Sequence, residues 1–338
     1  MVRQGARIVA FISLGLIALF LVYKSQQSDT DQNLLERLMS DFQQARPPYL
    51  IMMSAAFMLS NILRALRWQL MLRPMGISIS FFNALASIMV AYLTNLVIPR
   101  AGEIARATTV AKYEDISFEK ALGTVVLDRL LDLLCLLLVG MLTVLLAYDL
   151  IFAYFDRHFD LASRWQAMQA GKLLFMVLAL VLVLAAMIWF TKTQWYQHKL
   201  KTRVNVFVAG LWEGLTSIRN IQKPALFLLY SFGIWFLYFY MAYILFGALQ
   251  ATAHLHWIAG LVVFFFGSLG IVFPSPGGMG SYHFLAIESL SLYQIDATTA
   301  FTYANLSFFT IQVFTIIGFG VLSLVLLPRF NKPQPSIK

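Results

Sequence analysis

Residues 95–106 read Asn-Leu-Val-Ile-Pro-Arg-Ala-Gly-Glu-Ile-Ala-Arg and close an apolar run that begins near Ile77. A simple membrane-spanning helix needs neither a helix-breaking proline nor this concentration of charge. A second apolar run ends in the same Pro-x-x-Gly skeleton, at Phe273-Pro274-Ser275-Pro276-Gly277-Gly278. Two broken apolar segments at comparable positions of two halves are the sequence pointer to a transport site at a repeat interface.

Composition indicates a polytopic membrane protein. The chain is 60% hydrophobic and 12% charged, with a mean hydropathy of +0.74, whereas soluble domains carry about 25% charged residues. The net charge of +9 is explained by the positive-inside rule and by anionic headgroups, so we expect no nucleic-acid partner. The single cysteine, Cys135, excludes a disulfide framework and a cysteine-rich metal site. We expect neither a cofactor nor a metal.

The apolar segments predict an all-α fold, because about 20 residues span a bilayer as a helix. They fall at about 8–23, 49–63, 77–99, 121–147, 172–191, 224–250, 256–273 and 300–327. We expect a single transmembrane domain over residues 1–338. Its parts are a first half at 1–170 with a break near 95–106, a cytoplasmic amphipathic helix at 191–223, a second half at 224–328 with a break near 273–283, and a basic tail at 329–338.

Charges flanking the segments predict the orientation. Arg3 and Arg7 precede the first segment, and the tail adds Arg329 and two lysines, so both termini are expected in the cytoplasm. The loop at 24–48, in which Asp41 is counted, has a net charge of −1 and is expected outside.

The same counting gives the broken segments an unusual topology. Arg73, before these segments, is expected inside, and the 149–171 loop after them is expected outside. The segments at 77–99 and 121–147 together therefore make one net crossing, so one of them must return to the side that it entered. The second half requires the same return from the opposite side. The prediction is about six full spans plus two oppositely oriented re-entrant helical hairpins, an inverted-repeat, transporter-like arrangement.

Charged residues inside apolar segments are costly and are functional candidates by default. Asp128, Arg129 and Asp132 share one helix at spacings of three and four, so Arg129 and Asp132 are expected to pair. The alternative is a structural ion pair that only locks the bundle. Arg64 and Arg67 end the second apolar segment, either as topology anchors or as a clamp for a headgroup phosphate.

Arg100, Glu103 and Arg106 recur every three residues after Pro99 and are expected on one face of the following helix. The amino end of that helix would attract an anion into the break. Glu103 is expected to pair with Arg106 or Arg100 and to hold it in place.

The second break supplies conformational freedom rather than charge. Pro274, Gly277, Gly278 and Gly280 suit a tight loop with close backbone approach. His283 follows on the next helix, where it either titrates against a phosphate or is an ordinary buried histidine. No catalytic or nucleotide-binding motif is found, so we do not expect an enzyme.

Three motifs together resemble one known family: Asn95–Arg106, Val126–Asp132 and Pro274–Gly280. The chain is similar to the flippase-like, lysylphosphatidylglycerol synthase transmembrane-domain family, as a stand-alone member without the aminoacyltransferase domain. Asp128 stands where the family usually has Glu, and His283 stands where many members carry an acid. The resemblance places the family's motif positions on Arg64, Arg67, Asn95, Pro99, Arg100, Gly102, Glu103, Arg106, Arg129, Asp132, Pro274, Gly277, Gly278 and Gly280.

These observations predict a flippase of the bacterial inner membrane that moves an anionic phospholipid or a polyprenyl-phosphate-linked lipid. The expected partner is the lipid itself, and a homo-oligomer or a complex with a lipid-synthesis enzyme stays open. A membrane-embedded lipid-modifying enzyme, which would use Glu103, Asp128 or His283 as its acid or base, is the first alternative. An accessory partner of a glycosyltransferase or aminoacyltransferase is the second. A small-solute or ion transporter is the third, and the excess of arginine favours an anion as its substrate.

Overall fold

The computed structural model describes residues 34–151, 212, 220–273 and 275–331. These residues are mainly helical and contain no strand, which confirms the predicted all-α class for the described part of the chain. The elements are α2 (Leu34–Gln44), α3 (Pro47–Leu72), η1 (Arg73–Met75), α4 (Phe81–Val97), α5 (Gly102–Tyr113), α6 (Phe118–Leu146), α12 (Pro224–Ile244), η3 (Leu245–Ala248), α13 (Trp257–Val272), η4 (Pro276–Gly278), α14 (Ser281–Ser291), α15 (Ala297–Phe308), the π-helical turn η5 (Phe309–Thr315) and α16 (Ile316–Phe330).

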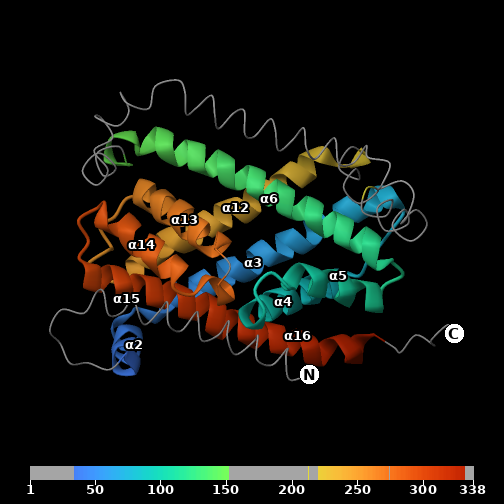
Figure 1. Cartoon of the computed structure of the whole chain (residues 1–338), viewed down its shortest axis with the longest axis horizontal. Coiled ribbons are helices and arrows are strands. Elements are labelled where there is room, and N and C mark those ends of the chain that lie inside the picture. The colour runs from blue at the N-terminus through green and yellow to red at the C-terminus, as the bar shows by residue number, and fades with distance from the viewer. Residues whose placement is uncertain (1–33, 152–211, 213–219, 274, 332–338) are drawn as a thin grey trace, which may run out of the picture.

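Four helical stretches in the described part are long and apolar enough to cross a membrane, and they follow the long axis of the molecule (Figure 1). They are Pro47–Met75, Phe118–Leu146, Pro224–Ala248 and Ala297–Phe330. The expected helices at 8–23, 172–191 and 191–223 lie outside the described residues. The predicted count of six spans therefore stays a prediction.

The first break falls between α4 and α5, as predicted. Helix α4 ends at Val97, Ile98 is extended, and Arg100 has a left-handed φ of 68°, which residues other than glycine rarely adopt. The chain then turns back along α4. A Cβ on Gly102 would lie 2.4 Å from the Ala91 carbonyl oxygen, so only glycine lets the two arms approach so closely.

The second break falls between α13 and α14. Gly277, Gly278 and Gly280 all have positive φ, which explains the concentration of glycine here. Gly270 gives the two arms their close approach, because its Cβ would lie 2.7 Å from the Ser281 carbonyl oxygen. Pro274 lies outside the described residues.

The two hairpins occupy opposite halves of the molecule, and their broken ends meet near its middle (Figure 1). The Arg100 guanidinium donates a hydrogen bond to the carbonyl oxygen of Val272, at the end of α13. A Cβ on Gly277 would lie 2.7 Å from Leu96, in the last turn of α4. The broken ends of the two hairpins therefore contact each other, and both the inverted repeat and the re-entry of the hairpins into a membrane stay predictions.

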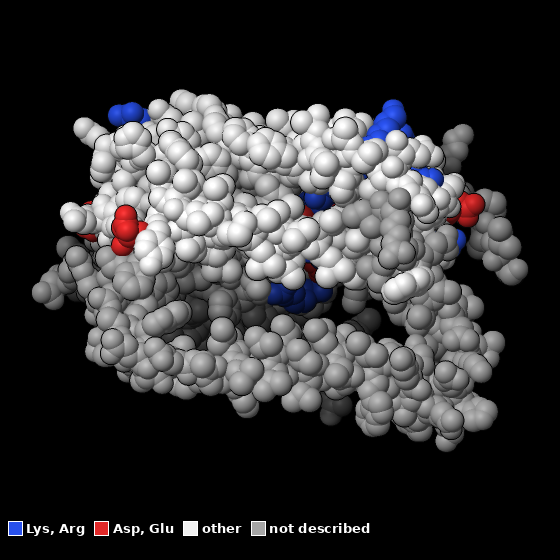
Figure 2. Space-filling model, turned by 90° about the horizontal axis from the view of Figure 1, so that it is seen from above, with Lys and Arg blue, Asp and Glu red and all other residues white. Residues whose placement is uncertain are grey.

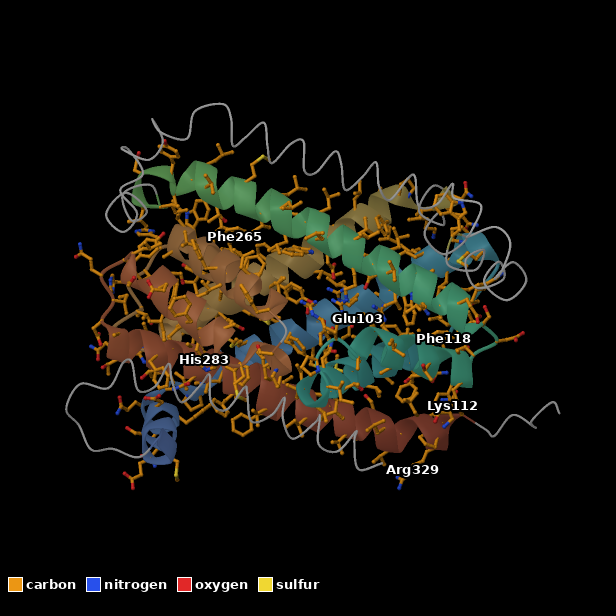
Figure 3. All side chains as sticks on the ribbon, viewed as in Figure 1. Glu103, Lys112, Phe118, Phe265, His283 and Arg329 are labelled. Carbon is orange, nitrogen blue, oxygen red and sulfur yellow. The ribbon has the colours of Figure 1, made fainter. Side chains whose placement is uncertain are left out.

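Charged residues on the described surface gather toward the two ends of the molecule, and the band between is largely uncharged (Figure 2). Exposed leucines of α6, such as Leu134, Leu137 and Leu145, contribute to that band. Lys112 and Arg329 lie at one end, near Phe118 (Figure 3). Such a band, flanked by charge, is the surface expected of a chain whose long axis crosses a bilayer.

Candidate functional site

The candidate site is built around Asp128, a fully buried carboxylate on α6 that binds three arginines. Its Oδ2 accepts from Arg64 Nη1 at 2.9 Å and from Arg106 Nη1 at 2.8 Å, and its Oδ1 accepts from Arg67 Nη2 at 2.6 Å. The three arginines are 0–1% exposed. Helices α3, α5 and α6 therefore meet at a single carboxylate.

Asp132, one turn further along α6, repeats the arrangement. Its two oxygens accept from Arg64 Nη1 at 2.6 Å and from Arg67 Nη2 at 2.8 Å. Arg129 Nη1 lies 3.6 Å from Asp132 Oδ2, so the predicted pair at spacing three is confirmed. Arg129 Nε also lies 3.0 Å from Glu103 Oε1. Together these residues form one network of four arginines and three carboxylates.

Neutral side chains complete the network. Trp68 lies under the Arg106 guanidinium, 4.0 Å from the ring centroid, and its indole N–H donates to Thr124 Oγ1 at 2.9 Å. Helix α12 contributes two hydroxyls, since Arg64 Nη2 donates to Tyr238 Oη and Arg67 Nη1 donates to Ser231 Oγ. A buried charge is tolerated only when it is paired and hydrogen-bonded. The two hydroxyls and the indole ring provide some of these contacts for the buried arginines.

The structure corrects three expectations. Arg64 and Arg67 do not end the second segment, because α3 continues to Leu72 and buries both, which argues against the topology-anchor alternative. Arg100 precedes α5 instead of sharing its face with Glu103. Glu103 pairs with Arg129, and neither expected partner binds it in the described structure.

A cavity of about 640 Å³ lies beside this network, where the two breaks meet. Ligand pockets typically measure about 300–1,000 Å³. Its charged lining residues are Arg64, Arg100, Glu103, Arg129 and Asp132. Residues of both breaks form a further part of the wall: Asn95, Pro99, Val272, Phe273, Ser275, Gly277 and Gly278. In Figure 2, colours of both signs also show in a hollow near the middle of the face.

Most of the predicted site residues fall into two groups. Those that line the cavity are Arg64, Asn95, Pro99, Arg100, Glu103, Arg129, Asp132, Gly277 and Gly278. Arg67, Arg106 and Asp128 are not lining residues. The Asp128 carboxylate binds all three arginines, and it thereby connects Arg67 and Arg106 to the lining residue Arg64. Gly102 supports the first turn, because its N–H donates to Asn95 Oδ1 at 2.7 Å.

His283 and Gly280 are not among the cavity-lining residues. His283 lies on α14, away from Glu103 (Figure 3), and is fully buried. Its assignment as a substrate-binding residue stays a prediction.

Several lining residues were not predicted from the sequence. They are polar and aromatic side chains of otherwise apolar helices: Tyr92, Tyr238, Tyr282, Ser307 and Gln312. Tyrosines are frequent near membrane interfaces, so nothing in the sequence marks Tyr238 among the other aromatic residues of α12. Among the described residues, no group of three or more His, Cys, Asp or Glu side chains is placed to hold a metal ion.

Comparison with known proteins agrees with the three motifs. The family model described as the lysylphosphatidylglycerol synthase TM region matches residues 7–320. The chain belongs to this family. A relative described as a UPF0104 membrane protein, from Methanothermobacter thermautotrophicus, is 28% identical over 261 residues, which cover 70% of this chain and 73% of the relative. No solved structure matches the chain.

The match to the lysylphosphatidylglycerol synthase TM-region family covers both hairpins and the ion network. The matched region contains both breaks, the arginine pair on α3 and the acidic pair on α6. The family resemblance stated from the motifs is thus confirmed, and the chain is a multi-pass membrane protein.

Proposed function

We propose that this protein moves an anionic lipid between the leaflets of its membrane, with the lipid phosphate held in the cavity where the two breaks meet. The observation that supports this most is the lining of that cavity, which joins a cluster of arginines to apolar walls. Guanidinium groups bind phosphate oxygens through two parallel N–H donors. A headgroup would occupy the polar part while its acyl chains remain in lipid.

The charge balance of the cavity suits a phosphate carrying one negative charge. Three arginines and two carboxylates line it, which leaves one net positive charge. Arg64 and Arg129 are already paired with carboxylates. Arg100 makes no ion pair with any described carboxylate and bonds only a backbone carbonyl. Arg100 is therefore the cation that a phosphodiester would neutralise.

The lengths of the hairpin arms support a re-entrant arrangement. Helices α5 and α14 have 12 and 11 residues, so at 1.5 Å per residue they reach about 16–18 Å. The hydrocarbon core is about 30 Å thick. Neither arm crosses it alone, and we propose that the two hairpins enter from opposite sides and place both breaks near the midplane.

The orientation follows from the described ends. Arg73, Lys112 and Arg329 belong to segments that meet where α4 begins and α16 ends, since Asn83 and Asn331 bond each other there. By the positive-inside rule this end faces the cytoplasm. We propose an inner-membrane location with both termini inside. We also propose transport without covalent chemistry and without a cofactor. Association of the protein with itself or with a lipid-synthesis enzyme is a separate proposal to test.

The proposal is tested by lipid translocation in proteoliposomes. Phosphatidylglycerol with a fluorescent acyl chain is placed in both leaflets, and an impermeant reductant bleaches the outer one. Protein-containing vesicles should lose more than half of the signal, and labelled phosphatidylcholine should be moved more slowly. Loss equal to that of empty vesicles for both lipids would remove the proposal. A chemically altered lipid recovered from the vesicles would select the lipid-modifying enzyme instead.

A further inference from the structure

Gln312 is a cavity-lining side chain that takes no part in the ion network. Several other neutral groups of the lining already have partners: Tyr282 donates to Ser307 Oγ at 2.6 Å, and the hydroxyls of Tyr92 and Tyr238 lie 3.4 Å apart. Gln312 is half-buried and makes no hydrogen bond with a described residue. Its carboxamide therefore offers both donors and an acceptor to a ligand in the cavity.

The π-helical turn η5 places Gln312 in the cavity wall. Phe308, Gln312 and Ile316 all line the cavity at intervals of four residues, whereas in an α-helix each such step would rotate the side chain by about 40°. The wider turn of η5 opposes this drift, and π-turns within helices are frequent at functional sites. Thr315 stabilises the turn, because its hydroxyl donates to the Thr310 carbonyl oxygen at 2.7 Å.

Gln312 lies where the two breaks meet. A Cβ on Gly277 would be 3.2 Å from Gln312 Oε1 and 2.7 Å from Leu96 Cδ2, so the second break lies against both the π-helical turn and the last turn of α4. Asn95 precedes Leu96 and is the other carboxamide of the lining. Its Oδ1 accepts from the Gly102 N–H, and its Nδ2 makes no hydrogen bond with a described residue. One carboxamide thus lies in the first break and one lies beside the second.

We propose that Gln312 and Asn95 bind hydroxyl groups of the lipid headgroup, so that the substrate is an anionic phosphodiester with a hydroxylated headgroup, such as glycerol or a sugar-like ring. This inference rests on the proposed function and names its substrate class. A hydroxyl both donates and accepts hydrogen bonds, as carboxamides do, so it matches the free groups of both side chains. Arg100 belongs to the same break as Asn95, so a phosphate held by Arg100 has its headgroup beside the carboxamides.

Other headgroup classes fit this lining less well. An ammonium on the headgroup cancels the phosphate charge, so such a lipid leaves the net positive charge of the lining unneutralised. It also has no acceptor for the Asn95 amide donors. A phosphomonoester carries a charge of about −1.5 to −2 at pH 7, which exceeds the net charge of the lining, and it brings no alcohol hydroxyl to the carboxamides.

The test compares lipids of equal charge in the translocation assay. Phosphatidylglycerol and phosphatidylmethanol are both phosphodiesters with a single negative charge, and only the first has headgroup hydroxyls. Wild-type protein should move phosphatidylglycerol about three- to tenfold faster, the size expected for one or two neutral hydrogen bonds. Phosphatidylinositol should also exceed phosphatidylmethanol, and its rate relative to phosphatidylglycerol tells whether a ring or glycerol is favoured. Equal rates for phosphatidylglycerol and phosphatidylmethanol, both above those of empty vesicles, would overturn the inference and leave the proposed function standing.

A variant assigns the preference to Gln312. Gln312→Met keeps an unbranched side chain of similar length without the amide, so the ratio of the two rates should fall to about one. Gln250→Met makes the same change at an exposed position outside the cavity lining and should keep the wild-type ratio. An unchanged ratio in well-folded Gln312→Met would also overturn the inference.

The wild-type comparison needs no variant, so it tests the substrate class even if Gln312→Met does not fold. Rates equal to those of empty vesicles for all three lipids would remove the proposed function and the inference together.

Discussion

The guanidinium of Arg100 and the carbonyl oxygen of Val272 join the broken ends of the two hairpins through a hydrogen bond. The bond leaves the charge of Arg100 uncompensated by any described carboxylate. A phosphate oxygen is a stronger acceptor for guanidinium than a neutral carbonyl, because its bond is charge-assisted on both sides. Under the proposed function, we therefore expect an arriving headgroup to take Arg100 from Val272 and to separate the two breaks.

Arg100→Ala should lower the rate of phosphatidylglycerol translocation by at least about tenfold, which corresponds to 1.4 kcal/mol, the low end for one hydrogen bond to a charged group. The melting temperature should change little, because Arg100 is exposed. Arg329→Ala, which removes a cation at the far end of α16, serves as the control. Full translocation by well-folded Arg100→Ala would remove Arg100 from the site.

Glu103 and Arg129 set the charge of the cavity through their ion pair. Glu103→Gln raises the net charge of the lining residues from one to two, and Arg129→Gln lowers it to zero. We expect native mass spectrometry to show more retained anionic phospholipid on the first variant than on wild type, and less on the second. Equal retention on both variants would show that charge in this cavity does not select the lipid.

Asp128→Asn should destabilise the protein by about 3–5 kcal/mol, because it leaves three buried arginines with one fewer counter-charge. The measurement is the free energy of unfolding from a denaturing-detergent titration. Asp115→Asn, the same change at an exposed position, should fall within about 0.5 kcal/mol of wild type. A similar small effect at Asp128 would contradict its central place in the ion network.

Gly102→Ala should open or unfold the first hairpin, because the new Cβ would lie 2.4 Å from a backbone oxygen of α4. Both the thermal stability and the translocation rate should fall. Gly318→Ala is the matched control, since nothing lies within 4 Å of that position and alanine is favoured over glycine inside a helix by about 1 kcal/mol. A Gly102→Ala protein as stable as Gly318→Ala would contradict the close packing of α4 on α5.

The sequence predicted the two breaks well because proline and glycine act locally. Pro99 ends a helix wherever its neighbours pack, and Gly277 permits a positive φ that other residues avoid. Charge inside an apolar run is equally direct evidence, since Asp128 must find partners when water is absent. Pro99 and Gly277 therefore predicted the two breaks, and the position of Asp128 predicted that it belongs to a group of paired charges.

The partners of those charges could not be predicted, because they depend on how separate helices pack. Glu103 binds Arg129 across two helices instead of an arginine near it in sequence. Tyr238 supplies a hydroxyl to Arg64 from an aromatic-rich helix with no distinguishing pattern. Asp41 was counted as a loop charge, yet α2 buries it against α15. Each of these contacts joins segments far apart in the chain.

The most direct test of a headgroup site between the hairpins uses phosphatidylglycerol with a photoreactive group on its headgroup. After illumination in nanodiscs, the labelled peptides are identified by mass spectrometry. A headgroup site between the hairpins predicts labels in both breaks, at residues 95–103 and 272–278, that are lost together in Arg100→Ala. Labels confined to the exposed face of α6 and to the charged ends of the molecule would contradict a headgroup site between the hairpins.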